Sequence, residues 1–317
     1  MSRKTASRSS SLKTLAVIAL IAVIAISVNS LLPSPPAPAF TWKALLGLEK
    51  TDLPLPDGTM QVHFIDVGNA DAALIRCGDK QMLIDGGEPD DGGAVVDYLR
   101  KQGVKRLDLV VATHPDADHI GGLPTVLTQL EVDRFLMSFM DDEHTPTSAS
   151  YERLLTALEE RDIPVTEAKP GQHWELGEAV VDVLGPVGEY EDTNNMSVVC
   201  KITFGKTRFL MMGDAERKAE TALLKSGADL RADVLKAGHH GSRSSTSEKF
   251  LSAVAPTHAV LSCGVDNRYG HPHPETLQIL QKHAVTVWRT DRCGTIVMIS
   301  DGQTVDVQAQ KERKAAA

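Results

Sequence analysis

The sequence predicts an α+β domain in which two β-rich halves pack sheet on sheet, with helices on the outside. Short apolar stretches rich in valine, isoleucine and leucine, typical of buried strands, recur along residues 60–307. Strands followed by helices occur twice in this span, once in each half. A chain of 317 residues with 42% hydrophobic and 24% charged residues also has enough apolar side chains for a sizeable core.

Residues 1–59 differ in composition from the rest of the chain. Residues 1–32 combine a basic start with an apolar run at 15–28, the layout of a secretory signal peptide, and Ala37-Pro38-Ala39 is a candidate cleavage site. The run is also close to the shortest length that spans a bilayer, so an uncleaved membrane anchor is the equal alternative. Residues 33–59 form a Pro-rich linker. Both alternatives place the folded domain outside the cytoplasm, secreted or periplasmic, or held by one N-terminal transmembrane helix.

The first half of the domain begins with three strands and a helix. Apolar stretches predict strands at 60–68, 72–77 and 81–87, and Gly78-Asp79 is a hairpin turn between the last two. An amphipathic helix is expected at 94–102, ended by Gly103. A buried strand at 107–113 and a helix at 151–160 follow.

The second half repeats this pattern of strands and helices. Strands are expected at 179–184, 197–204, 207–212, 233–237, 259–263 and 286–288, and helices at 215–226, 250–254 and 274–283. Residues 294–300 and 304–307 predict a closing hairpin. We expect residues 308–317 to be a frayed tail.

Charge and cysteine content exclude some classes of protein. The net charge of −9 argues against a broad basic surface for nucleic acid. It does not exclude a nuclease, because bound divalent cations reverse the local field of a carboxylate-rich site. The four cysteines are far apart without a C-x-x-C motif, which does not support a zinc ribbon and favours buried free thiols over disulfides.

A dense cluster of metal-binding residue types follows the strand at 107–113. It reads His114-Pro115-Asp116-Ala117-Asp118-His119, with Gly121-Gly122 behind it. Two imidazoles and two carboxylates at the end of a rigid strand predict a metal site. The extra carboxylate favours harder ions such as Mn²⁺ over Zn²⁺. The alternative is a polar loop whose aspartates cap the next helix.

Three other strand ends carry candidate partners for this cluster. Asp214 follows the strand at 207–212, although it could instead be the N-cap of the next helix. His239-His240 ends another strand, where neighbouring side chains point to opposite faces, so we expect one to bind metal and the other to face substrate or a carboxylate. Asp85 ends the third strand and could orient a ligand histidine.

These motifs resemble the metallo-β-lactamase superfamily, whose hallmark is H-x-H-x-D-H, but Asp116 stands where the second histidine is usual. The set is similar to the extracellular metal-dependent domain of ComEC-type DNA-uptake proteins. Their polytopic channel has no counterpart among the residues here, which contain one apolar segment. The further motifs that carry this resemblance are Asp66-Val67-Gly68-Asn69-Ala70-Asp71, Asn194-Asn195-x-Ser197, His239-His240-Gly241-Ser242 and Tyr269-Gly270-His271-Pro272.

The resemblance implies a four-layer αβ/βα sandwich with one or two divalent metal ions, Zn²⁺ or Mn²⁺, at one edge. His114 and Asp116 would hold one ion, and Asp118 and His119 the other. Asp214 would bridge them, and His239 or His240 would complete the second site. Asn194-Asn195 replaces a third superfamily histidine, so we expect the first ion to be held weakly, with Asn195 supporting the ligands from behind.

The implied chemistry is attack by a metal-activated water on a phosphorus or carbonyl centre. Asp118 and His240 are the candidates for handling the proton. Donors near the motifs that suit phosphate oxygens are Ser242, Arg243, Arg268 and His271, although the arginines could instead be solvated loop charges.

The favoured function is therefore an extracytoplasmic phosphodiesterase or nuclease that acts on DNA, single-stranded DNA included, or on another phosphate ester. One alternative is a hydrolase of a small ester, a lactone or a phosphocholine-type substrate. An alternative of another class is a non-catalytic binding module on the same fold. The sequence indicates no protein partner, and contact with a membrane would come through the N-terminal segment.

Overall fold

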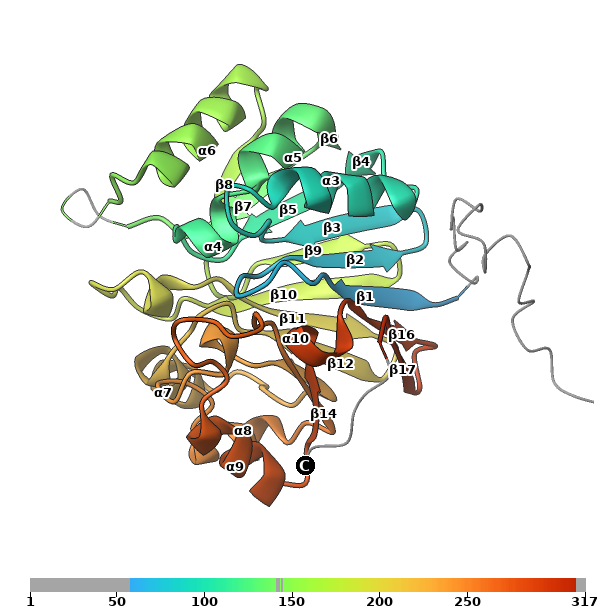
Figure 1. Ribbon diagram of the computed structural model, residues 1–317, viewed down its shortest axis with the longest axis vertical. Helices are drawn as coiled ribbons and strands as arrows, with labels where there is room; N and C mark the ends of the chain where they lie inside the picture. The colour runs from blue at the N-terminus through green and yellow to red at the C-terminus, as the bar shows by residue number, and fades with distance from the viewer. Residues whose placement is uncertain (1–57, 141–142, 144, 312–317) are drawn as a thin grey trace, which may run out of the picture. The chain divides into compact units, whose positions relative to one another are not determined.

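A computed structural model describes residues 58–140, 143 and 145–311 of the chain (Figure 1). The predicted signal or anchor segment at 1–32, and the linker up to residue 57, lie outside the described residues. In the part that is described, no helix is both long enough and apolar enough to span a membrane.

Two large sheets form the centre of the domain, as predicted. The eight-stranded sheet runs in the order β17 (Val305–Ala309), β16 (Ile296–Ser300), β1 (Met60–Phe64), β2 (Ala73–Cys77), β3 (Lys80–Ile84), β5 (Leu109–Ala112), β7 (Phe135–Met137) and β8 (Val165–Glu167). The seven-stranded sheet runs in the order β15 (Thr286–Arg289), β14 (His258–Leu261), β13 (Val234–Lys236), β12 (Thr207–Met211), β11 (Val199–Phe204), β10 (Ala179–Gly185) and β9 (His173–Leu176). A small sheet pairs β4 (Arg106–Leu107) with β6 (Glu131–Val132).

Helices cover the outer face of each sheet, which completes a four-layer sandwich (Figure 1). The eight-stranded sheet is covered by α3 (Gly92–Lys101), α5 (Leu123–Gln129) and α6 (Ala149–Glu160), with the short α4 (Ala117–Ile120) between them. The seven-stranded sheet is covered by α7 (Arg217–Ser226), α8 (Glu248–Val254) and α9 (Pro274–Lys282). The remaining short helical elements are η1 (Asn194–Met196), η2 (His239–Gly241) and α10 (Thr290–Cys293).

Three apolar clusters hold these layers together. The central one lies between the sheets and contains large side chains such as Phe64 and Phe209. The other two lie between each sheet and its helices, for example around Phe135 and around Phe250. Strand β5 is buried along its whole length, as expected for a parallel strand that is covered on both faces.

The C-terminal hairpin crosses back to the opposite sheet. β16 and β17 pair as predicted, but β16 continues the eight-stranded sheet by pairing antiparallel with β1, with Phe64 opposite Ile296. The sheets are therefore not built from one half of the chain each. Strand β17 ends at Ala309, two residues beyond the predicted domain end at 307.

Several element boundaries differ from the sequence prediction. The strand expected at 107–113 is interrupted at Asp108, whose carboxylate accepts hydrogen bonds from Lys80 Nζ (2.8 Å) and the backbone N–H of Gln81 (2.9 Å). Helices α4 and α5 and strands β6–β9, between Ala117 and Leu176, were not predicted from the sequence. In this segment only helix α6 was predicted. Helix α3 begins at Gly92, two residues before the expected start at 94.

Close packing of glycines fixes the loop that follows the metal motif. A Cβ atom on Gly122 would lie 2.1 Å from the carbonyl oxygen of Gly86 and 3.0 Å from the backbone of Gly92. The backbone N–H of Gly122 also donates to the carbonyl of Gly87 (3.0 Å). The start of α3, the end of β3 and the metal motif can therefore approach each other only because no side chain intervenes.

We predict that Gly122→Ala lowers the free energy of unfolding by about 1–3 kcal/mol, because the new methyl group overpacks a backbone contact. Gly93→Ala is the matched control, since a Cβ at this position in α3 would meet no described atom within 4 Å. That variant should instead gain up to about 1 kcal/mol from helix propensity. Urea unfolding of both variants measures the two effects, and equal stabilities would contradict the prediction.

Candidate metal centre

The predicted metal-binding residues converge where strands of both sheets end. Asp118, His119, Asp214 and His240 each offer a ligand atom, and these four atoms lie within 4.8 Å of one another. The first two follow β5 of the eight-stranded sheet, and the other two follow β12 and β13 of the seven-stranded sheet. The cluster therefore straddles the interface between the two halves of the sandwich.

Asp85 holds the histidines of the motif from behind. His119 Nδ1 donates to Asp85 Oδ2 (2.8 Å), so that Nε2 of the ring faces the cluster. The hydroxyl and the backbone N–H of Thr113 donate to the same carboxylate at 2.7 and 2.8 Å. Because the Thr113 hydroxyl donates to Asp85, its oxygen accepts from His114 Nδ1 (3.1 Å), and Nε2 of this second ring is left free as well.

His240 is held in the same way by a backbone carbonyl. Its Nδ1 donates to the carbonyl oxygen of Ser262 (2.9 Å). Its Nε2 lies 3.2 Å from Asp118 Oδ2 and 3.5 Å from Asp214 Oδ2. The ring is buried, so its position is set by the fold.

His239 approaches the cluster from the more open side. Its Nδ1 donates to Glu216 Oε1 (2.8 Å), and its Nε2 lies 3.7 Å from Asp214 Oδ2. His239 and His240 have positive φ angles of 47° and 51°, because they form the turn η2 and are not part of the preceding strand. The expectation that they point to opposite faces of a strand is therefore wrong, and both rings approach Asp214.

The unsatisfied polar atoms of the cluster fit a bound divalent cation. Among the described residues, His114 Nε2, His119 Nε2 and Asp214 Oδ1 are buried and have no hydrogen-bond partner. His119 Nε2 and Asp214 Oδ1 are 3.3 Å apart. Burying such atoms without a partner is costly, and divalent ions that accept imidazole and carboxylate ligands would satisfy them.

The first of the two expected ion positions is more exposed. Asp116 Oδ2 lies 3.7 Å from His114 Nε2, and the Asp116 side chain is 44% exposed. Its other oxygen accepts a hydrogen bond from the Thr193 hydroxyl (2.8 Å). Asn194, where the superfamily histidine is expected, lies with its amide nitrogen 3.5 Å from His239 Nδ1. This position thus has fewer buried ligands than the one formed by Asp118, His119 and His240.

The cluster stabilises opposite charges on its carboxylates and imidazoles. Burial alone would raise the pKa of Asp214, but the neighbouring His240 and His119 outweigh it and hold this pKa well below its usual value. Burial also acts to raise the pKa of Asp118, yet the hydrogen bond to His240 and the charge of His119 lower it to about 2. For His119 burial acts to lower the pKa, and the charges of Asp214 and Asp85 raise it well above its usual value. The site therefore strongly attracts positive charge.

Helix α7 begins at Arg217, after an N-cap at Glu216. The alternative that Asp214 caps this helix is therefore wrong, and its carboxylate is available to the cluster.

Asn195 supports the protein backbone, and its described hydrogen bonds reach no ligand side chain. Its side-chain oxygen accepts from the backbone N–H groups of Glu216 (3.2 Å) and Ala219 (3.0 Å) at the start of α7. Its side-chain nitrogen donates to Asp192 (2.6 Å). The predicted support of the ligands by Asn195 is thus replaced by anchoring of the helix whose cap, Glu216, holds His239.

Ser242 and Arg243 are turned to other partners. The Ser242 hydroxyl is buried and shares a hydrogen bond with Ser244 (2.8 Å). Arg243 extends into solvent with a side chain that is 66% exposed, and its guanidinium lies 3.7 Å from Glu275. For Arg243 the alternative of a solvated loop charge describes the structure better.

Arg268 and His271 do lie beside the cluster. Arg268 lines a cavity of about 300 Å³ together with Asp116, Asp118 and Tyr269. Its guanidinium donates to the Tyr269 hydroxyl (2.5 Å) and lies 4.7 Å from the centre of that ring. The His271 ring is 5.2 Å from the His239 ring, and burial followed by the charge of His239 lowers the pKa of His271 to about 4.

Four neighbours of the cluster were not predicted as site residues. Asp71 and Lys236 form a buried ion pair (2.7 Å) beneath it. Thr113 and Glu216 hold ligand-type histidines, as described above. Asp71 belongs to one of the motifs that carried the resemblance, and Lys236 is a charged residue in an otherwise apolar strand, so both had a signal in the sequence. Partners such as Glu216 have no such signal.

Comparison with known proteins gives a consistent family assignment. The sequence pattern of the metallo-β-lactamase superfamily matches residues 65–265. ComE operon protein 3 of Bacillus subtilis is 32% identical over 257 residues, which cover 74% of this chain and 32% of that protein. Recombination protein 2 of Haemophilus influenzae is 30% identical over 244 residues, covering 75% of this chain and 28% of that protein. Competence protein ComA of Neisseria gonorrhoeae is 29% identical over 245 residues, covering 76% and 32%. The chain thus spans about a third of the length of these relatives.

Solved structures support the fold. The metallo-β-lactamase fold protein YhfI of Bacillus subtilis superposes with a TM-score of 0.50 at 14% identity, covering 76% of this chain and all of that one. A mutant of the β-hydroxylase CmlA gives a TM-score of 0.50 at 16% identity, covering 77% of this chain and 54% of that one. Such low identities carry the fold alone.

We predict that Asp85→Asn weakens the binding of a divalent ion by about 10–100-fold, because the amide no longer orients the His119 ring as the carboxylate does. Titration calorimetry with Mn²⁺ and with Zn²⁺ measures the dissociation constants. Asp108→Asn is the matched control. Asp108 also accepts hydrogen bonds from a backbone N–H and a side chain, but both donors, Gln81 and Lys80, lie outside the metal cluster. Equal affinities of the two variants would contradict a role for Asp85 in holding the ligand.

Proposed function

This chain belongs to the metallo-β-lactamase superfamily, and on that basis we propose that it is a divalent-metal-dependent hydrolase that cleaves phosphodiesters, DNA above all, outside the cytoplasm. The observation that carries this proposal is the convergence of buried, unpartnered histidine nitrogens and a carboxylate oxygen at the sheet edge. The fold accepts one or two divalent ions. A bound ion would lower the pKa of a water so that it gives up its proton near neutral pH, and would stabilise charge on the reacting oxygens.

The ligand set favours a phosphorus centre over a carbonyl centre. Asp116 adds a third carboxylate to those of Asp118 and Asp214, and oxygen-rich sites prefer the hard ions that commonly serve phosphate chemistry. Arg268 lies in the same cavity as Asp116 and Asp118 and offers a planar donor that suits phosphate oxygens. The names of the relatives, competence and recombination proteins, support a nucleic acid as substrate.

The two predicted proton-handling residues are assigned different roles. The side chain of Asp118 is 25% exposed, and that of His240 is 1% exposed. His240 therefore serves as a ligand through Nε2, because substrate cannot reach it. Asp118 faces the cavity as a carboxylate, where it orients the attacking water and accepts its proton. His271, neutral because its pKa is low, lies at the edge of the cluster as an additional hydrogen-bonding group.

An extracytoplasmic location is supported by the N-terminal sequence, with its basic start and apolar run, whether that segment is a cleaved signal or an anchor. The substrate would then be extracellular DNA or another phosphate ester that meets the domain outside the membrane.

We predict that the purified chain cleaves bis(p-nitrophenyl) phosphate and single-stranded DNA in Mn²⁺ or Zn²⁺, and that chelation by EDTA abolishes turnover. Asp118→Ala should lower the rate by about 10²–10⁴-fold, because it removes both a ligand and the proton acceptor. Asp162→Ala, at an exposed turn after α6, is the control and should leave the rate unchanged. Circular dichroism verifies that both variants are folded.

Three outcomes of this assay would contradict the proposal. Cleavage of p-nitrophenyl acetate without any phosphodiester cleavage would point to the ester-hydrolase alternative. Bound metal without turnover on any substrate would point to the binding module. Full activity in Asp118→Ala would show that the assignment of the centre is wrong.

Arg268 and Arg243 form a matched pair for testing how phosphate is bound. We predict that Arg268→Gln raises KM for the phosphodiester about tenfold by removing a charged hydrogen-bond donor from the cavity. Arg243→Gln should leave KM unchanged, since that guanidinium is solvated beside Glu275. Steady-state kinetics of both variants decide the matter, and an equal effect of the two substitutions would rule out a specific role for Arg268.

A further inference from the structure

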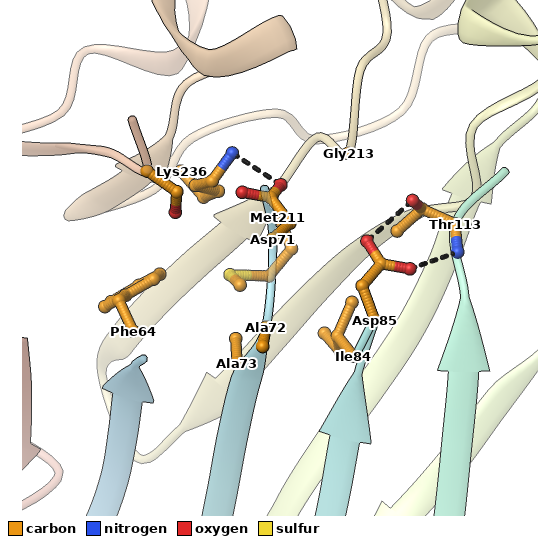
Figure 2. A pocket seen from close by; sticks show the side chains of 11 residues that line it. Phe64, Asp71, Ala72, Ala73, Ile84, Asp85, Thr113, Met211, Gly213 and Lys236 are labelled. Atoms are coloured by element: carbon orange, nitrogen blue, oxygen red, sulfur yellow. Dashed lines mark hydrogen bonds and ion pairs between the residues drawn. The ribbon is translucent and has the colours of Figure 1, made fainter. Parts of the chain in front are cut away.

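A buried ion pair lies directly beneath the metal centre. Lys236 is the last residue of β13, Asp71 precedes β2, and they are only 3% and 6% exposed. Lys236 Nζ lies 2.7 Å from Asp71 Oδ2. Figure 2 shows this contact on one side of a small cavity of about 10 Å³, with the hydrogen bonds from Thr113 to Asp85 on the other side.

The ion pair joins the two chain segments that supply the ligands. The backbone N–H of Asp71 donates to the carbonyl of Asp118 (3.1 Å), so Asp71 is tied to the metal motif of the eight-stranded sheet. Lys236 belongs to the strand that leads into His239-His240, and its ammonium also donates to the carbonyl of Ala237 (3.0 Å). A change in the ion pair would therefore change the distance between the two ligand sets.

The second oxygen of Asp71 faces the ligand histidines from behind. Within the described part of the chain, Asp71 Oδ1 has no hydrogen-bond partner, and it lies 3.7 Å from His240 Nδ1. Asp71 Oδ2 lies 4.0 Å from His119 Nδ1. A carboxylate on this side favours the tautomer with hydrogen on Nδ1, which leaves Nε2 free to bind a cation.

Burial of the pair needs an explanation beyond stability. Removing a lysine and an aspartate from water costs free energy, and apolar residues of similar size would stabilise a protein interior as well or better. The pair lies between the ligand-bearing segments and behind the rings of His119 and His240. This position explains why a charged pair is buried there.

We propose that Lys236 and Asp71 are a positioning pair that sets the spacing of the two ligand-bearing segments, adds to the tautomer preference that Asp85 and Ser262 impose, and so increases the affinity of the centre for a divalent ion. This rests on the metal centre of the proposed function. The pair acts on the ligands through His119, His240 and the backbone of Asp118.

The test compares Lys236→Met, Asp71→Asn and the double variant in the full chain. Each single variant leaves one buried charge uncompensated and should unfold at a lower temperature than the wild type. The double variant removes both charges, so its Tm should return close to that of the wild type. We expect the double variant to bind Mn²⁺ with a dissociation constant at least tenfold higher than that of the wild type. Titration calorimetry and the EPR signal of free Mn²⁺ measure this constant.

The outcomes separate a positioning role from a structural one. A double variant that binds Mn²⁺ as tightly as the wild type would overturn the proposal. Lys201→Met is the matched control, because Lys201 is 8% exposed and its ammonium donates to the carbonyl of Asp229 (2.7 Å), away from the cluster. It should lower Tm without changing the affinity, and an equal loss of affinity would also overturn the proposal. A wild-type chain that binds no Mn²⁺ or Zn²⁺ would instead refute the proposed function, on which this inference depends.

Discussion

Hydrogen bonds donated by Nδ1 of the clustered histidines, the ring nitrogen that points away from the metal site, determine the geometry of the metal centre. Asp85 accepts from His119, the Ser262 carbonyl accepts from His240, and Glu216 accepts from His239. Each bond fixes both the tautomer and the orientation of its ring, so that every Nε2 is directed toward Asp214. The acceptors come from segments that are distant in sequence, and the four-layer sandwich brings these segments together. Without these bonds the same histidines could rotate, and the cluster would no longer present converging lone pairs.

The strand ends of the site could be predicted from the sequence because they follow a physical rule. A polar residue that directly follows a buried apolar strand is held at the sheet edge, and strands that run in the same direction deliver such residues to the same edge. Asp85, Asp214 and the motif from His114 to His119 all obey this rule. The two large sheets and the outer helices were predictable for a related reason, because apolar runs and amphipathic periodicity record which faces are buried.

Features that depend on tertiary contacts were not predictable in this way. The turn conformation of His239 and His240 is set by positive φ angles, which a pair of histidines does not signal. Whether Asn194 or Asn195 approaches the site depends on which amide is used to anchor α7. Lys236 finds its partner across the interface between the sheets, and no spacing in the sequence links it to Asp71. In each case a residue type was visible in the sequence, but its partner was not.

The return of the C-terminal hairpin to β1 has a consequence for how the domain is made. Strand β1 lies between β2, its neighbour in sequence, and β16, which is synthesised last among the strands that contact it. During translation one edge of β1 therefore stays unpaired until almost the whole domain has left the ribosome, and such an exposed edge is prone to mispairing. A chain that stopped before residue 296 would carry all the clustered metal-binding side chains and still lack β16 and β17, so that β1 would be an edge strand. Completion of the fold thus waits for the synthesis of residues 296–309, and pairing over so long a sequence separation slows folding.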